Sequence, residues 1–354
     1  MKSSELGEHL FGAVLGTLDV LTVHIGARFG LYDLLARSPL TVGETAEASG
    51  MAPRYCREWL EQQTVAGFLE VDDAAAAAEQ RRYFLPAEHA TVLCDRESLE
   101  YFAPFADVLA AAAVKLPALL EAYRTGGGVA WHEYGETMRL GQAEANRPLF
   151  LQVLGNEWLP QLSDVHTALA KGGRVADIGC GDGWSSIGMG TAYPDATIVG
   201  FDLDPASIAA ATDNAGSYGL ADRVRFEHAD VAALTEHVGA YDLVTAFECV
   251  HDMSDPVGVL SAARRLVAPG GTVLVMDERV PEEFTGPGDP IEQFMYGFSL
   301  LVCLPDGMSH PDSAGTGTVM RPSVLRGYAR AAGFGDIEVL DIDHDMFRLY
   351  RLVE

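Results

Sequence analysis

Residues 175–186, VADIGCGDGWSS, carry glycine at three alternate positions directly after a short apolar run. Gly179, Gly181 and Gly183 can adopt the positive φ values that a sharp turn from a strand into a helix requires. Lacking Cβ atoms, they also let a ligand approach the main chain closely. The dinucleotide fingerprint GxGxxG is not matched in either register, and the chain has no GxxxxGK[ST] loop. The turn therefore predicts a nucleoside-like ligand that needs no phosphate site.

Two acidic residues follow the next two predicted strands. Asp202 comes about 20 residues after the glycine turn, where a carboxylate can accept hydrogen bonds from both hydroxyls of a ribose. Asp230 ends the third strand, where it can accept a hydrogen bond from the exocyclic amine of an adenine. Each of them could instead cap the helix that follows it. A glycine turn and two carboxylates at the ends of three successive strands together favour a nucleoside site.

The C-terminal half must supply the elements that position these residues. From Arg174 on, short β-rich runs alternate with helical patterns such as 205–219 and 256–268. This alternation predicts a parallel sheet with helices on both faces, a Rossmann-like doubly wound α/β fold whose ligands bind beyond the carboxyl ends of the strands. The predicted strands are 174–179, 197–203, 224–230, 241–247 and 271–278, with weaker ones at 336–343 and 346–352.

The N-terminal half has a mostly helical pattern. Apolar spacing over 8–37 predicts one long helix or two helices separated near Gly30. Thr41 and Glu44 form a capping-box pattern for a short helix that ends at Gly50. A helix from Pro53 to Gly67 and extended pieces at 68–71 and 83–85 complete a winged helix-turn-helix pattern. We expect two domains, a helical and winged-helix domain over 1–165 and a Rossmann-like domain over 166–354.

Charge argues against nucleic acid as a partner. The chain has 24 basic and 51 acidic side chains, a net charge of −27, and residues 1–165 alone have 12 basic and 23 acidic side chains. In the helix where a recognition helix would lie, Arg54 and Arg57 are balanced by Glu58 and Glu61. A DNA-binding helix needs a surplus of cations. We therefore expect this domain to serve dimerisation and the substrate pocket.

The remaining composition favours a cytoplasmic protein. The five cysteines are scattered without metal-ligand spacing, which predicts reduced thiols. The apolar residues of 10–35 are interrupted by Asp19, His24, Arg28 and Asp33, so we expect no membrane span.

As an ordered series, the motifs of the C-terminal half resemble those of the class I S-adenosylmethionine-dependent methyltransferases. The series runs from the glycine turn through Gly200-Phe-Asp202, Ala229-Asp230-Val231 and Tyr241-Asp242 to Pro269-Gly270-Gly271. The winged unit resembles the dimerisation domain of small-molecule O-methyltransferases, which implies a homodimer. The resemblance implies S-adenosyl-L-methionine as cofactor, with S-adenosyl-L-homocysteine as product. The residues implied at the cofactor are Asp177, Gly179, Gly181, Gly183, Trp184, Asp202, Leu203, Asp230, Val231, Phe247 and Glu248.

The segment after the fourth strand, Phe247–Asp255, resembles the His-Asp segment where such O-methyltransferases keep their general base. We expect His251 to take this role, because an imidazole titrates close to operating pH. His251 could instead merely pack or cap at a helix end. In the family an acidic residue supports this histidine, and Glu278, Glu282 and Glu283 are approximate candidates.

A small acceptor, apolar or aromatic, is expected between the halves and is most simply methylated at oxygen. Phe294, Phe298 and Leu301 recur at helical spacing, so a plain core helix explains Phe298 at least as well as a role in the acceptor pocket. The candidate acceptor residues are Trp131, His132, Tyr134, Phe150, Met295 and Phe298.

We predict no metal, because Glu248 and His251 follow the fourth strand in place of a run of close oxygen ligands. Two other functions stay open on the sequence: methylation of nitrogen or carbon in a small molecule, and a transcription regulator whose methyltransferase-like half senses a ligand.

Overall fold

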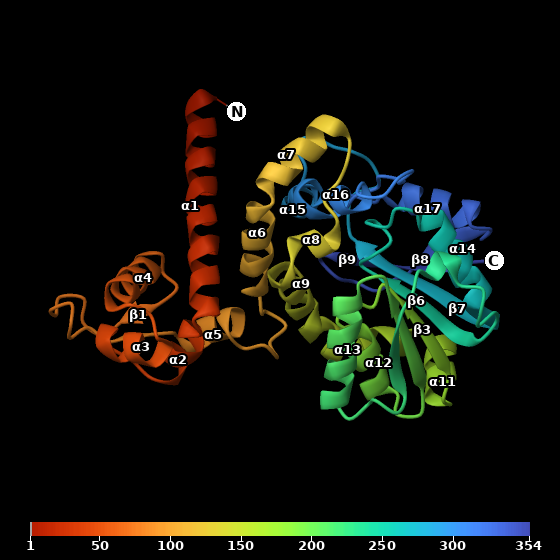
Figure 1. The fold of residues 1–354 in the computed structure, drawn as a ribbon, viewed down its shortest axis with the longest axis horizontal. Coiled ribbons are helices and arrows are strands. Elements are labelled where there is room, and N and C mark those ends of the chain that lie inside the picture. Colours follow the sequence, from red (N-terminus) through yellow and green to blue (C-terminus); the bar gives the residue numbers. More distant parts are fainter. Residues whose placement is uncertain (1) are drawn as a thin grey trace. The chain divides into compact units, whose positions relative to one another are not determined.

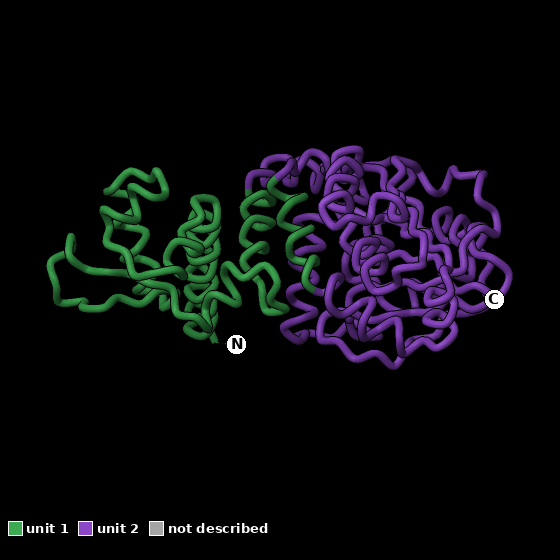
Figure 2. The backbone as a smooth tube through the Cα atoms, turned by 90° about the horizontal axis from the view of Figure 1, so that it is seen from below, with its two compact units in different colours: residues 1–113, 137–148 green, residues 114–136, 149–354 purple. Residues whose placement is uncertain are grey.

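The computed structural model describes residues 2–354, which form two compact units (Figure 2). Unit 1 consists of the chain up to Ala113 together with Thr137–Pro148. Unit 2 consists of Val114–Glu136 and Leu149–Glu354. The chain thus returns to unit 1 once before it builds the sheet of unit 2. The domain boundary at 165 stays a prediction.

Unit 1 begins with two helices, α1 (Ser3–Arg28) and α2 (Leu31–Arg37). Gly30 separates them with a φ of 64°, which confirms the break predicted there. The capping box of Thr41 and Glu44 starts α3 (Val42–Ser49), and Gly50 ends it at a φ of 72°. The other elements wholly or mostly in unit 1 are α4 (Pro53–Val65), β1 (Glu70–Val71), β2 (Tyr83–Phe84), α5 (Ala87–Leu93), α6 (Pro104–Val114) and α9 (Glu136–Leu149).

The predicted winged-helix pattern is present in unit 1. β1 and β2 pair antiparallel as the wing behind α4. Trp59 and Leu60 of α4 are buried, as predicted, and the indole of Trp59 donates to the carbonyl of Thr22 at 2.9 Å. The hydroxyl of Tyr32 donates to Gln63 at 2.5 Å. These contacts dock α4 against α1 and α2 and define the core of the unit.

Helix α1 carries an unusually exposed apolar surface. By length and composition it could cross a membrane, and only 11% of its most apolar window is buried, so it is not a core helix of this unit. Glu5, Glu8 and Asp19 interrupt the helix with charge. Its exposed large apolar side chains are Leu6, Leu10, Phe11, Val14, Leu15, Leu18, Leu21 and Ile25.

Unit 2 contains a seven-stranded sheet in the order β5-β4-β3-β6-β7-β9-β8 (Figure 1). β3 to β7 are parallel, whereas β9 runs antiparallel to β7 and to β8. The expectation of a parallel sheet was therefore wrong at β9, which alone runs opposite to the other strands of this sheet. The short connection 340–346 lets β8 and β9 pair only as antiparallel neighbours. The strands are β3 (Arg174–Ile178), β4 (Thr197–Asp202), β5 (Val224–His228), β6 (Tyr241–Phe247), β7 (Val267–Glu278), β8 (Asp336–Val339) and β9 (Phe347–Val353).

Strand order reverses at β3, which pairs with both β4 and β6. Because parallel crossovers are right-handed, the reversal places helices on both faces of the sheet and opens a crevice at the carboxyl ends of β3 and β6. The helices of unit 2 are α7 (Leu116–Thr125), α8 (Trp131–Tyr134), η1 (Phe150–Trp158), α10 (Leu159–Gln161), α11 (Ser163–Ala170), α12 (Trp184–Ala192), α13 (Pro205–Ser217), η2 (Val231–Ala233), α14 (Pro256–Leu266), α15 (Pro290–Phe298), η3 (Ser299–Cys303), α16 (Leu304–Gly307) and α17 (Pro322–Ala331).

Candidate active site

The glycine turn lies between β3 and α12. Gly179, Gly181 and Gly183 have φ values of 66°, 51° and 86°. A Cβ at Gly179 would lie 2.8 Å from Cys249, and one at Gly183 would lie 2.7 Å from Phe226. A Cβ at Gly181, in contrast, would meet no atom within 4 Å. The turn therefore packs tightly on protein at its two ends and leaves bare main chain open at its centre.

Asp177 holds this turn from inside the protein. Its side chain is 1% exposed, and Oδ2 accepts hydrogen bonds from the hydroxyls of Ser185 at 2.6 Å and Ser186 at 2.7 Å. Oδ1 accepts from the hydroxyl of Thr245 at 2.7 Å. Burial raises the pKa of Asp177, and the three hydroxyls oppose that rise. These contacts tie the end of β3 to α12 and β6, while contact of Asp177 with the cofactor stays a prediction.

We expect Asp177→Ala to lower the free energy of unfolding by roughly 2–4 kcal/mol, because three buried hydroxyls would lose their acceptor. Urea denaturation followed by circular dichroism measures this. The exposed Asp195→Ala is the control and should change the free energy by no more than about 0.5 kcal/mol. Equal stability of the two variants would show that Asp177 does not hold the turn.

Asp202 lies beside the open centre of the turn. Its Oδ2 accepts a hydrogen bond from the main-chain nitrogen of Gly181 at 2.9 Å, and Oδ1 accepts from that of Asp204 at 2.8 Å. Burial raises the pKa of Asp202, against the effect of these main-chain donors. A carboxylate has about four lone-pair positions, so both oxygens keep capacity for further donors. Leu203, the next residue, is 61% exposed.

Asp230 and Val231 lie after β5. The Asp230 side chain accepts from the main-chain nitrogen of Ala232 at 3.0 Å and so caps η2. Val231 is 5% exposed and belongs to the apolar core of the sheet. The capping alternative for Asp230 is therefore present, and its role at an adenine stays a prediction.

Three more predicted cofactor residues lie at the start of α12 and the end of β6. Phe247 stacks on Phe150 of η1, with ring centroids 6.1 Å apart and an interplanar angle of 23°. Glu248 has a φ of 53°, and such strained main chain outside glycine recurs at functional sites. Trp184 is 8% exposed and meets the ring of Tyr218 edge to face. The structure thus joins Phe150, predicted for the acceptor, to Phe247, predicted for the cofactor.

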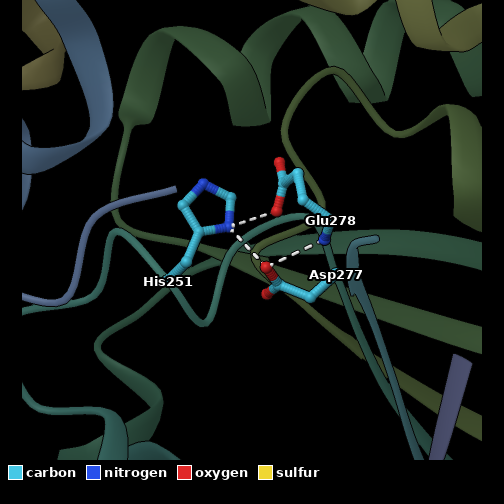
Figure 3. A group of neighbouring side chains, drawn as sticks. All are labelled: His251, Asp277 and Glu278. Carbon is cyan, nitrogen blue, oxygen red and sulfur yellow. Dashed lines mark hydrogen bonds and ion pairs between the residues drawn. The ribbon is translucent and has the colours of Figure 1, made fainter. Parts of the chain in front are cut away.

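His251 lies just beyond β6, with two carboxylates on one of its nitrogens (Figure 3). Its Nδ1 is 3.0 Å from Oδ1 of Asp277 and 3.0 Å from Oε2 of Glu278, both at the carboxyl end of β7. His251 is 3% exposed, Asp277 0% and Glu278 7%. Because both carboxylates lie at Nδ1, we assign a proton to that nitrogen, which leaves Nε2 as the position for acid or base chemistry. The thiol of Cys303 also interacts with His251.

The charges of this cluster shift its proton equilibria. Burial alone would lower the pKa of His251, but the charges of Glu278 and Asp277 outweigh it and raise that pKa well above its usual value. Burial raises the pKa of Glu278 to about 8, opposed by the charge of His251 and reinforced by that of Asp277. The cluster therefore holds more protons near neutral pH than the same residues would in water.

We expect the unfolding free energy to fall as pH rises from 6 to 8. The fall is up to about 1.4 kcal/mol per pH unit for each group whose pKa is higher in the folded than in the unfolded state. The folded pKa of Glu278 lies above the unfolded one, so the folded state binds more protons in this window and loses stability as they leave. Urea denaturation at several pH values measures the slope. Glu278→Gln cannot lose that proton and should show a shallower fall, whereas an identical slope would contradict this assignment.

Asp252, next to His251 in the chain, is a further, partly buried acid at this site. Burial raises the pKa of Asp252 to about 8, which His251 opposes and the charges of Asp306, Glu278 and Asp202 reinforce. The charges of the predicted base and of Asp202 thus both act on Asp252. Titratable groups with shifted pKa values gathered at one sheet edge are typical of an active site.

The structure adds Asp277, which sequence reasoning missed. Among the three acidic candidates for supporting His251, Glu278 contacts the imidazole, whereas Glu282 and Glu283 are exposed. The available signal in the sequence was the Asp-Glu pair at the end of the predicted strand 271–278. In the structure both residues are buried despite their charge.

The predicted acceptor residues of unit 2 occupy different surroundings. The main-chain nitrogen of Trp131 donates to Asp306 at 2.7 Å, and the charge of His132 also acts on Asp306. The hydroxyl of Tyr134 donates to the carbonyl of Leu301 at 2.8 Å. Thus α8 is tied to η3 and α16. Elsewhere, Met295 is 3% exposed, and Phe298 packs on Phe294 with ring centroids 4.6 Å apart, consistent with the core-helix alternative.

Comparisons with known proteins agree with this fold. A family model described as "Methyltransferase domain" matches residues 169–299, and one described as "Rv2258c-like winged HTH domain" matches residues 17–95. The ubiquinone biosynthesis O-methyltransferase of Pseudomonas aeruginosa is 33% identical over 172 residues, 48% of this chain and 67% of that protein. The chain belongs to the S-adenosylmethionine-dependent methyltransferases, and its winged N-terminal region and Rossmann-like sheet have the fold of class I O-methyltransferases.

Among individual relatives, the 27-O-demethylrifamycin SV methyltransferase of Amycolatopsis mediterranei is 31% identical over 150 residues. That match covers 42% of this chain and 55% of the relative, so the chain spans about half the length of that curated relative. The structure of mitomycin 7-O-methyltransferase MmcR is similar over 99% of this chain and 98% of its own, with a TM-score of 0.73 and 19% identity. Human N-acetylserotonin methyltransferase, solved with S-adenosylmethionine, is similar over 100% and 99%, with a TM-score of 0.72 and 18% identity. At these identities the structures show a shared fold.

Proposed function

We propose that this protein transfers a methyl group from S-adenosylmethionine to the hydroxyl oxygen of a small apolar or aromatic acceptor. The observation that carries the proposal is the placement of His251, backed by Asp277 and Glu278, at the same sheet edge as the glycine turn and Asp202. When bound, the cofactor supplies an electrophilic methyl group on a sulfonium. The curated relatives named above support the choice of oxygen.

The residues around the glycine turn fit such a nucleoside. The open space at Gly181 admits a ligand against bare main chain, and Asp202 next to it keeps lone pairs for ribose hydroxyls. Phe247 supplies an apolar wall at the end of β6. Asp177 positions the turn from behind through its three hydroxyl partners.

In our proposal, His251 removes the proton of the acceptor hydroxyl. Nε2 takes the proton, and the two carboxylates hold Nδ1–H in place and stabilise the imidazolium that forms. Trp131 and Tyr134 of α8, with Phe150 of η1, would position the acceptor ring. No step requires a metal ion.

Binding and turnover test the proposal separately. Isothermal titration with S-adenosylhomocysteine should show one site per chain, and a failure to bind at millimolar ligand would remove the proposed cofactor. Incubation of the enzyme with small-molecule extracts and a deuterated methyl donor should label an acceptor that mass spectrometry identifies. Labelling at nitrogen or carbon would reject the assignment to oxygen.

For unit 1 we propose a role in homodimerisation in the cytoplasm, without binding to DNA or a membrane. A contiguous exposed apolar surface as long as that of α1 marks an interaction site. A second copy of α1 can cover this surface with apolar side chains of the same kind, as an isologous interface requires. The net charge of −27 opposes binding to nucleic acid.

We expect the double variant Leu10→Glu/Leu18→Glu to be a monomer, because the dimer would bury two added charges from each chain. Light scattering after size exclusion should give twice the 37.9 kDa of one chain for the wild type and the mass of one chain for the variant. Val65→Glu, at a residue 89% exposed on α4, is the matched control and should stay dimeric. A monomeric wild type would contradict the role of α1.

A further inference from the structure

Carboxylate oxygens of Asp277 and Glu278 gather on the Nδ1 side of His251 (Figure 3). The single hydrogen of Nδ1 in His251 is directed to Oδ1 of Asp277. Within residues 2–354, Oδ2 of Asp277 is buried without a hydrogen bond, and buried Oε2 of Glu278 has only the ion-pair contact of 3.0 Å with Nδ1. Buried carboxylate oxygens without a partner are costly, so the cluster has unused capacity for a cation.

The geometry of the cluster suits one small cation. One donor atom from each of His251, Asp277 and Glu278 lies within 4.8 Å of the other two, and both carboxylate oxygens are 3.0 Å from Nδ1. Nitrogen and oxygen ligands bind Zn²⁺ at about 2.0–2.2 Å, which separates neighbouring ligands by roughly 3–3.5 Å. Once its protons have left, the cluster consists of two carboxylates and a neutral imidazole, a charge of −2 that a divalent ion neutralises. An imidazole ligand favours zinc over magnesium or calcium.

We propose that His251, Asp277 and Glu278 form a site for a divalent transition-metal ion, Zn²⁺ being the representative, and that the bound ion inhibits the enzyme. The ion takes the place of the proton on Nδ1 and of the further protons that His251 and Glu278 hold near neutral pH, and all of these protons leave to solvent. It is therefore a competitor of the protonated cluster and not a cofactor. Once the ion withdraws charge from the ring, Nε2 is a weaker base. The inhibition rests on the proposed function, whereas the binding does not.

The test is a titration of the full-length, tag-free, metal-stripped protein with zinc chloride, followed by calorimetry. We expect one ion per chain in the wild type. Glu278→Gln and Asp277→Asn each remove a ligand and should weaken zinc binding by at least about tenfold. Removal of a residue that only hydrogen-bonds to a metal ligand already lowers affinity by about that factor. Glu282→Gln and Glu283→Gln, at exposed positions, are matched controls and should bind like the wild type.

Cobalt(II) serves as a spectroscopic probe of the ligands. A visible spectrum of nitrogen and oxygen ligation supports the site, whereas a thiolate charge-transfer band would assign the ion to the cysteines and overturn the proposal. Absence of stoichiometric zinc binding, or wild-type affinity in Glu278→Gln, would also overturn it. If Asp277→Asn does not fold, Glu278→Gln and the cobalt spectrum still decide. Because these measurements need neither cofactor nor acceptor, their outcome is independent of whether methyl transfer is found.

Discussion

His251→Ala is expected to lower kcat by about 10²- to 10⁴-fold while leaving the affinity for S-adenosylhomocysteine unchanged. The reason is that removal of the imidazole leaves the acceptor hydroxyl without a base, whereas the glycine turn and Asp202 do not depend on this side chain. Steady-state kinetics with the identified acceptor and calorimetry with the product nucleoside measure the two quantities. Loss of both together would indicate a damaged fold.

His166→Ala provides a matched control for this variant. His166 lies on α11, is exposed and contacts the hydroxyl of Tyr193, before the chain enters β3. It should have wild-type turnover. Near-normal turnover of His251→Ala itself would show that no base is required, which favours an acceptor nitrogen or carbon.

Asp202→Ala is expected to weaken binding of S-adenosylhomocysteine by about 10²-fold or more. Hydrogen bonds to a charged group contribute about 1.5–3 kcal/mol each, and this variant loses the carboxylate proposed to accept from two ribose hydroxyls. It also removes the acceptor of the Gly181 main-chain nitrogen, so the open centre of the turn loses its support. Calorimetry with the wild type and variant gives the ratio of dissociation constants.

For Asp202→Ala, the control is Asp213→Ala, an exposed aspartate in the following helix α13. It removes the same charge from the same part of the sequence but lies outside the turn, so binding should stay at the wild-type value. If Asp202→Ala binds as tightly as Asp213→Ala, the ligand does not contact this carboxylate and the proposed nucleoside slot is wrong.

Short-range patterns predicted much of the fold correctly. The capping box of Thr41 and Glu44, the stop at Gly50 and the break at Gly30 depend only on residues within one turn of each other. Strand positions such as 241–247 followed from compact β-rich runs between turn residues. For the glycine turn, the positive φ values follow from residue type alone.

Long-range packing decided what these patterns could not. The sheet is mixed because its last strand, β9, pairs antiparallel with β7 after the chain has formed β8. Two π-helical segments, η1 and η3, were not foreseen, since their hydrogen-bond pattern has no residue signature of its own. Packing of the sheet also brings Asp177 into hydrogen-bond contact with Thr245, which lies 68 positions away in the sequence.

By itself, the amino-acid sequence determined the family, the turn of bare main chain and the candidate base, because each depends on residue type and local spacing. Only the tertiary structure decided which acids support His251. Asp277 and Glu278 reach it across 26 and 27 positions of the chain because β6 and β7 are hydrogen-bonded neighbours that end at one edge of the sheet. Acidic residues at similar distances along the chain, Glu282 and Glu283, face solvent, since no strand carries them to that edge.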